Sequence, residues 1–434
     1  MLESMLNAFR APDIRKRLLF VLGILVVYRA LSHVLIPGIN PATLSAQGDN
    51  GVFGLLTLFS GGDLKRMSIV GLGLNPYINA TIIMQILQST IPSLQALSRE
   101  GEYGRNQITK YSRYLSVPLA ALQAYGILAY MQATSGANTF NTPFSFEKYE
   151  SLTMILSLTV GSVLLMWLGE LITEKGIGNG ISFIIFAGIV SRIPSAVTSF
   201  FVSPDWLELF ALGILGLLII FVIIFVQEGQ RRIPIQYANR VRGHRIYQGG
   251  STFLPLRVNM AGVIPIIFAI SILMFPAQIA TYFTTSNVQW VKDISHGVVS
   301  WLSTTGPLYL SLYFLLTFAF AFFYTFIVFK PDETANNLRK AGGFIPGIRP
   351  GAPTEEYLRR VALRITVAGA FFVATVAVLP MVIAALPTFK NLSNAGVGVG
   401  LGGTSILIVV SVVVETMKQL EAQLMMRSYE GFIR

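Results

Sequence analysis

The sequence has 434 residues, of which 53% are hydrophobic and only 12% are charged, and its formal net charge is +11. Soluble domains carry about 25% charged residues, so this composition excludes an ordinary soluble domain and indicates a membrane protein. The absence of cysteine excludes disulfides and thiol chemistry. Strand-period alternation is absent, which argues against a β-barrel.

Ten apolar segments predict an all-α, polytopic membrane protein, since about 20 residues of helix cross a bilayer. The first follows a basic stretch that resembles the start of a signal peptide. It is too long for a signal peptide and lacks a following cleavage site, so we expect it to be retained. The predicted spans are 18–36, 75–92, 115–133, 152–172, 180–200, 209–227, 259–283, 307–329, 365–386 and 402–418.

The loops between these spans alternate in charge. Most of the basic residues fall in the set that includes both termini and the loops 228–257 and 330–364. The positive-inside rule therefore predicts that both termini are cytoplasmic, and an even number of spans agrees.

Ten spans divide into two halves of five, 1–205 and 206–434. An odd half enters from the opposite face the second time, which is the arrangement of inverted, pseudo-symmetric repeats. Gly-rich stretches that each lead into a serine and an apolar run, at 176–183 and 396–407, fit such a repeat. Ordinary glycine enrichment in packed membrane helices explains them equally.

The stretch 59–88 predicts a broken membrane segment. A short half-helix over 61–72, with Asp63 in its first turn, is interrupted by Gly71 and Gly73. Pro76 then restarts a full span, as Pro is tolerated at a helix start. Broken backbone at membrane depth is stable only inside protein or along a watery cavity. The alternative is an outer loop with a surface helix.

The two long cytoplasmic loops, 228–257 and 330–364, mix basic residues with Gly, Pro and apolar anchors. They predict ordered, protruding basic hairpins that suit RNA, anionic lipid or an acidic protein face. Positive charge that only controls topology is the alternative. Pro346 and Pro350 fix Arg349 on a stiff turn, which topology control does not require.

Polar residues inside the spans form a candidate seam. Thr81, Gln85 and Gln88 recur along one helix face, Gln123 lies in the third span, and Asn259 opens the seventh. They predict either ordinary hydrogen bonds between helices or a seam that holds two halves closed and can separate.

Several kinds of chemistry lack their motifs. The sequence has no phosphate loop, H-E-x-x-H or G-x-S-x-G motif, and its three histidines lack metal-ligand spacing. These absences predict no enzyme, metal or cofactor. Acidic residues avoid the middles of the spans, which weakens the alternative of an ion-coupled secondary transporter with inverted repeats. A structural membrane scaffold is a second alternative.

Motifs along nearly the whole chain resemble the SecY family (SecY/Sec61-alpha), which forms the channel of the Sec protein translocon. They are FSGGDLKRMSI, NPYINATIIMQIL, MWLGELITEKGIGNGISFIIFAGIV, QEGQRRIPIQYANR, LPLRVNMAGVIPIIFA, DETANNLRKAGGFIPGIRPG and GGTSILIVV. The resemblance implies a bacterial plasma-membrane channel that passes unfolded secretory polypeptides between its two halves. It also implies release of signal sequences and membrane segments into lipid through a lateral gate between spans 2/3 and 7/8.

The resemblance implies roles for particular residues. The pore ring is Leu74, Ile78, Ile185, Ile267, Ile406 and Ile408. The plug includes Gly61, Asp63, Leu64, Lys65, Arg66, Met67, Ile69 and Leu72. The polar seam belongs to the gate, and Arg240, Arg245 and Arg349 contact the ribosome or the motor ATPase SecA. The small membrane subunits SecE and SecG complete the implied partners, with signal sequences, nascent polypeptides and membrane lipid.

Overall fold

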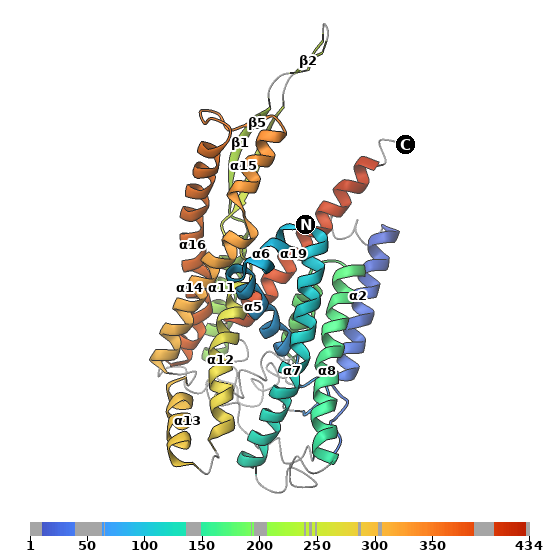
Figure 1. The fold of residues 1–434 in the computed structure, drawn as a ribbon, viewed down its shortest axis with the longest axis vertical. Helices are drawn as coiled ribbons and strands as arrows, with labels where there is room; N and C mark the ends of the chain where they lie inside the picture. Colours follow the sequence, from blue (N-terminus) through green and yellow to red (C-terminus); the bar gives the residue numbers. More distant parts are fainter. Residues whose placement is uncertain are drawn as a thin grey trace.

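The computed structural model describes residues 11–39, 63–64, 66–135, 149–191, 193–194, 206–237, 240–242, 245–247, 250–284, 288–302, 306–385 and 403–430. The fold is mostly helical, and its helices run side by side along the molecule (Figure 1). The N-terminal helices are α2 (Pro12–Leu31), α5 (Asn75–Thr90), α6 (Pro92–Arg99), α7 (Glu102–Ser135), α8 (Tyr149–Lys175) and α9 (Gly180–Val190). The C-terminal helices are α11 (Trp206–Glu228), α12 (Ile264–Phe283), α13 (Gln289–Trp301), α14 (Pro307–Val328), α15 (Pro331–Lys340), α16 (Ala352–Ala385) and α19 (Gly403–Glu430).

Each predicted span overlaps one of these helices. Within the described ranges, three helical stretches are long and apolar enough to cross a membrane: Tyr149–Lys175, Pro307–Lys340 and Ala352–Leu379. Shorter apolar helical stretches are Gly180–Val190, Gly213–Glu228 and Ile264–Ala277. Helices α7 and α16 begin more than ten residues before the predicted spans 115–133 and 365–386, and α19 continues past the predicted span 402–418. In each case polar residues next to the apolar span are also helical.

The first helix differs from its prediction, because α2 ends at Leu31 whereas the predicted span reached residue 36. The backbone N–H of Ser32 bonds the carbonyls of Tyr28 and Ala30 and closes the helix. The residues that follow pair with a distant segment: the Ile36 N–H donates to the Met67 carbonyl at 2.9 Å. Backbone pairing across the fold has therefore replaced the last helical turn.

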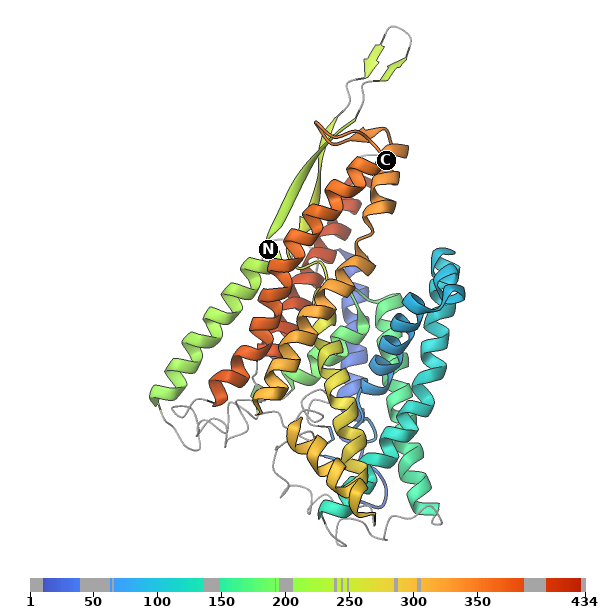
Figure 2. The same cartoon turned by 60° about the vertical axis from the view of Figure 1, so that its left-hand side comes forward.

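The first long loop, 228–257, forms the predicted hairpin. Strands β1 (Gln230–Tyr237) and β4 (Ser251–Arg257) pair antiparallel, and β2 (Arg240–Arg242) pairs with β3 (Arg245–Tyr247) at the tip. The hairpin projects beyond the helices at the end where α19 finishes (Figures 1 and 2). Ile233 and Ile235 alternate with exposed residues along β1 and are buried, so this face anchors the hairpin.

The second long loop is not a hairpin, and that prediction is wrong. It forms α15, the short strand β5 (Gly343–Phe344) and a turn that leads into α16. Strand β5 pairs with β1, which gives a three-stranded sheet in the order β4-β1-β5. Ile233, Ala335, Ile345 and Leu358 pack in one small core, so both loops form a single unit, which we call the projecting unit.

Two larger buried clusters organise the helices. Helix α5 packs against α7, whereas α14 packs against α12 and α16. Helix α12 also contacts α5 and α7, so it joins the N-terminal helices to the C-terminal ones. The predicted ring residues and three of the predicted plug residues fall in or against these two clusters.

Candidate functional site

Five of the six predicted ring residues lie in one buried apolar cluster, which we call the ring cluster. Leu74 and Ile78 come from the start of α5, Ile185 from α9, Ile267 from α12 and Ile408 from α19. All five side chains are at most 9% exposed. Residues more than 300 positions apart in the chain therefore meet at one apolar point between the two halves.

The sixth residue, Ile406, is half-buried and does not belong to the ring cluster. It packs against the other large buried cluster, which contains residues of α7, α12, α14 and α16 and which we call the second cluster. Helix residues two apart point to nearly opposite sides, so Ile406 and Ile408 do not share a face. Val412 follows Ile408 by four positions and lies in the ring cluster. Sequence reasoning missed Val412, although the spacing of four from Ile408 was a signal for it.

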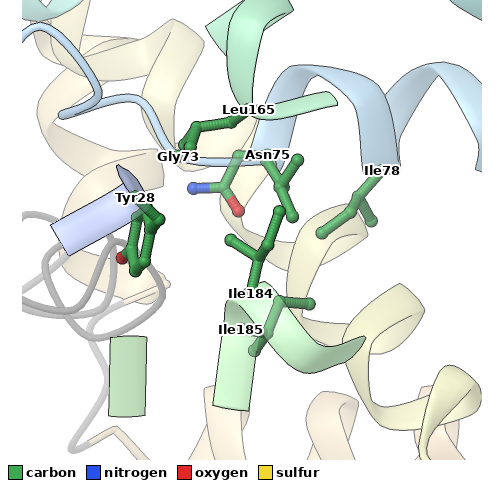
Figure 3. A pocket seen from close by; sticks show the side chains of 8 residues that line it. Tyr28, Gly73, Asn75, Ile78, Leu165, Ile184 and Ile185 are labelled. Atoms are coloured by element: carbon green, nitrogen blue, oxygen red, sulfur yellow. The ribbon is translucent and has the colours of Figure 1, made fainter. Parts of the chain in front are cut away.

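A small pocket adjoins the ring cluster. Its lining residues come from α2, the segment before α5, α5 itself, α8 and α9: Tyr28, Gly73, Leu74, Asn75, Ile78, Leu165, Ile184 and Ile185. Figure 3 shows Ile78, Ile184 and Ile185 around this pocket, together with the Tyr28 ring. The sequence did not single out Tyr28, because a tyrosine inside a span is ordinary.

The predicted half-helix over 61–72 is wrong for the residues that the structure describes. Residues 63–64 and 66–74, which we call the turn segment, form consecutive turns. Met67 has a φ of 47°, a left-handed conformation that interrupts a right-handed helix. Gly61 and Lys65, two of the predicted plug residues, lie outside the described residues.

The turn segment is nevertheless buried. Leu64, Met67 and Leu72 lie in the second cluster with residues of α7, α12 and α14. Ile69 is half-buried, whereas the side chain of Arg66 is exposed. The segment therefore fills the interior beside the ring cluster. Its last residue, Leu74, is itself a member of that cluster.

Backbone contacts fix the turn segment to the N-terminal helices. Leu35 and Ser68 form an antiparallel bridge, flanked by the bonds from Ile36 to Met67 and from Ile69 to Val34. This pattern makes Leu35 and Ser68 a pair without mutual hydrogen bonds, whose Cα atoms lie about 4.5 Å apart in regular sheets.

Helix α8 supports the segment from another side. A Cβ atom on Gly161 would lie 2.0 Å from the Ile69 carbonyl oxygen, so only glycine permits this approach. One residue on, the Ser162 hydroxyl donates to the Gly73 carbonyl at 3.1 Å. The segment therefore depends on α2 and its extension on one side and on α8 on the other.

Asp63 is an ionisable residue almost completely enclosed in this region. The Tyr28 hydroxyl donates to Asp63 Oδ2 at 3.0 Å, and Asp63 is 1% exposed. Burial raises the pKa of the Asp63 carboxyl to about 6, while the hydrogen bond from Tyr28 and the side chains of Arg29, Arg66 and His33 oppose that rise. An ionised carboxylate is costly in such a place unless donors surround it.

A polar cavity of about 460 Å³ opens between α5, α6, α7 and α14. Three predicted seam residues, Thr81, Gln85 and Gln88, lie in its wall, opposite Tyr324 of α14. Gln85 Oε1 is buried without a hydrogen-bond partner among the described residues. Arg105 and Lys330 are the charged lining residues of this cavity.

The other two predicted seam residues lie elsewhere. Gln123 on α7 is buried, and its Nε2 has no partner in the described part of the chain. Asn259 precedes α12, and its side chain bonds the backbone N–H and carbonyl of Gly262. That side chain closes a turn before the helix, which starts at Ile264 rather than at the predicted residue 259.

The predicted cytoplasmic contact residues lie on the projecting unit. Arg240 is in β2 and Arg245 is in β3, at the tip of the hairpin. Arg349 is exposed, and its carbonyl accepts a hydrogen bond from Thr354 Oγ1 at 2.8 Å. Gly347 and Gly351 flank it with φ values of 80° and 110°, so a rigid turn presents the guanidinium.

Ion pairs occur at the polar ends of the helices. Arg113 of α7 bonds Glu170 of α8 at 2.6 Å, and Lys418 of α19 bonds Glu228 of α11 at 2.9 Å. Among the described residues, no group of three or more His, Asp or Glu side chains is placed to hold a metal ion. The geometry therefore offers an apolar closure, a buried segment and a polar cavity.

Comparisons with known proteins show which proteins this chain is similar to. The family model SecY matches residues 68–417. The chain is 44% identical to "Protein translocase subunit SecY" of Streptomyces scabiei over 450 aligned positions, covering 100% of both chains. It is 41% identical to the protein of that name from Mycobacterium bovis, again over 100% of both.

Solved structures share the fold at lower sequence identity. "The structure of a protein conducting channel" matches with a TM-score of 0.63 and 19% identity, covering 93% of this chain and 91% of that one. "Sec61 in the Canine ribosome-channel complex from the endoplasmic reticulum" matches with a TM-score of 0.60, also at 19% identity and the same coverage. These likenesses concern the arrangement of the helices alone.

Proposed function

Because the chain belongs to the SecY family, we propose that it is the channel subunit of a protein translocase, without enzymatic activity of its own. It passes unfolded secretory polypeptides across a bacterial plasma membrane and releases signal sequences and membrane segments into lipid. Family membership also sets aside the alternative of a secondary transporter.

The observation that carries this proposal is the ring cluster. A translocation pore must hold back ions and still pass many different polypeptides. A narrow ring of aliphatic side chains does both, because it dewets and offers no hydrogen bonds to a passing chain. Leu74, Ile78, Ile185, Ile267 and Ile408 supply such a ring from four helices and the residue before α5. We propose that Ile406 supports it from the adjacent packing.

We propose that the turn segment is the plug of the idle channel. It is buried beside the ring and joined to it through Leu74. Its contacts are backbone bonds to 34–36 and the close approach at Gly161 rather than a continuous helix. Such a segment can leave its site without unwinding a spanning helix.

We propose that the polar cavity marks the cytoplasmic mouth of a lateral gate formed by α5 and α7 on one side and α12 and α14 on the other. A signal sequence that separates these helices buries apolar area, which contributes about 25 cal/mol per Å². Polar contacts between membrane helices contribute only about 0.6 kcal/mol each. A sufficiently apolar segment therefore opens the gate, and a polar one stays in the pore.

The finer architecture belongs to the same proposal. Ten spans form two inverted halves, 1–205 and 206–434, with both termini in the cytoplasm. This topology places the projecting hairpin and the Arg349 turn on the cytoplasmic side. Membrane subunits of the SecE and SecG type complete the complex.

We propose that the projecting unit binds the ribosome and the motor ATPase SecA, with Arg240, Arg245 and Arg349 among its contacts. The solved Sec61 structure with the same fold is described as part of a ribosome-channel complex. Replacing Arg349 by Glu should slow motor-driven transport at least severalfold, because the rigid turn would present the wrong charge. Unchanged motor-driven transport in vesicles would refute this contact.

The plug is tested by locking it. The variant Leu35→Cys/Ser68→Cys adds the only two cysteines to a chain that has none, at a bridged pair suited to a disulfide. Oxidation should block transport of a secretory protein into vesicles, and reduction should restore it. Each single cysteine variant should be insensitive to oxidant.

Quantitative disulfide formation with undiminished transport would contradict the proposal. In that case, the turn segment would be a fixed part of the wall and not a movable plug.

A further inference from the structure

The hydrogen bond between Tyr28 and Asp63 has a feature that sealing the pore does not require. An apolar residue at position 63 would fill the site at lower cost than a carboxylate. Asp63 is instead 1% exposed and Tyr28 is 4% exposed, and the bond between them joins the turn segment to α2. Asp63 Oδ1 has no hydrogen-bond partner among the described residues.

Asp63 also closes the turn that it anchors. Its backbone carbonyl accepts a hydrogen bond from the Ser68 N–H at 3.1 Å. Asp63 therefore holds the turn segment in two ways, through its side chain to Tyr28 and through its backbone to Ser68. Tyr28 reaches the other functional element as well, because its side chain lines the pocket with Leu74 and Ile78 (Figure 3). Tyr28 therefore lies between the two elements: its hydroxyl bonds the turn segment, and its side chain belongs to the ring cluster.

We propose that Tyr28 and Asp63 form a titratable latch: a carboxylate buried against the Tyr28 hydroxyl keeps the turn segment docked but poised for release, and its protonation tightens the seal. The proposal rests on the plug function proposed above. Tyr28 is here a positioning residue, which acts on the pore through Asp63.

The sign follows from linkage. A carboxyl exposed to water has a pKa of about 3.9, which is the value expected once the segment is released. Burial in the docked segment raises the pKa of Asp63 to about 6. The docked state therefore binds the proton more tightly. Proton binding therefore stabilises the docked state relative to the released state. This stabilisation is fully present below about pH 3.9 and is lost as the pH rises through the pKa of Asp63 in the docked state.

The size of the effect follows from the same two pKa values. Between pH 7.5 and pH 5, linkage predicts a fall of up to about tenfold in the ratio of released to docked channels. The charged and titratable side chains that act on Asp63 are Tyr28 and Arg29 of α2, His33 just after α2, and Arg66 of the segment itself. His33 must therefore be controlled separately.

The experiment measures ion conductance of the purified idle complex in planar bilayers. Tyr28→Phe leaves the carboxylate without its donor, so conductance at pH 7.5 should rise severalfold and should fall again at pH 5. Asp63→Asn keeps an acceptor for Tyr28 without the charge, so its conductance should lie below that of the native chain and should lose the pH dependence.

The double variant Tyr28→Phe/Asp63→Asn should conduct less than Tyr28→Phe at pH 7.5 and should show no pH dependence, because a neutral amide costs less to bury without the Tyr28 hydroxyl than a carboxylate does. This recovery also shows that the phenylalanine is compatible with folding. Tyr309→Phe is the matched control, since the Tyr309 hydroxyl is buried without a partner in the described chain and its loss should not raise conductance. His33→Gln should retain the pH dependence.

Three results would overturn the latch: a Tyr28→Phe channel as tight as the native one, an Asp63→Asn channel that leaks as much as Tyr28→Phe, or an unchanged pH dependence in Asp63→Asn. The disulfide between positions 35 and 68 separates this failure from failure of the plug. If the disulfide blocks transport while Tyr28→Phe is silent, only the latch is wrong. If the disulfide has no effect, the plug itself is wrong.

Discussion

The two ends of α5 differ in chemistry on one helix face. Near its start, Ile78 is buried in the ring cluster, whereas Gln85, two turns later, lies in the wall of the polar cavity. Residues seven apart share a helix face, so this single face passes from aliphatic to polar along its length. In the proposed channel, closure and opening are therefore separated along α5: the aliphatic end would exclude water, and the amide-lined end leaves room for it.

The largest effect is expected from making the aliphatic end polar. Ile78→Asn places an amide in a site that is 5% exposed, where an unpaired polar group costs about 1–3 kcal/mol. Water relieves that cost, so the closed ring should hydrate and the idle channel should conduct ions at least about tenfold more than the native channel. Bilayer conductance at neutral pH measures this.

Ile86→Asn is the matched control, because Ile86 lies on the same helix but is 41% exposed. It should leave the idle conductance unchanged. Equal leaks from both variants would mean that polarity anywhere on α5 opens the channel, and the contrast between its two ends would be lost.

A smaller effect, of opposite sign, is expected at the polar end. Gln85→Leu removes a buried acceptor that has no partner among the described residues, which should stabilise the closed gate by about 1 kcal/mol, a factor of about five. Signal sequences should then need more apolar residues to insert. Insertion of a series of graded hydrophobicity measures this, with Gln95→Leu at the cavity rim as the control. An unchanged threshold would exclude Gln85 from the gate.

Much of the helical framework was predictable from apolar segment length. Each predicted span overlaps a helix, and five of the six residues predicted for the ring lie in one buried cluster. The errors occur where contacts between distant segments decide the backbone. Residues 34–36 and 67–69 pair with one another, so neither stretch continues the helix predicted from its local sequence.

The site was less predictable where side-chain direction matters. Ile406 and Ile408 have the same chemistry and lie two residues apart, yet only Ile408 faces the ring cluster. Tyr28 gave no signal, because its importance depends on a carboxylate 35 residues away. The second loop lacked a hairpin partner of its own, and β5 instead pairs with β1, which is more than 100 residues earlier.

The central claim is that a polypeptide passes through the ring of which Ile78 is part. The chain has no cysteine, so Ile78→Cys introduces a single thiol there. A secretory protein that carries one cysteine in its translocating part and is stalled midway should form a disulfide with this thiol. Leu22→Cys should not form this disulfide, because Leu22 is 53% exposed and lies on the outer side of α2. A disulfide at Leu22→Cys, together with none at Ile78→Cys, would contradict a path through the ring.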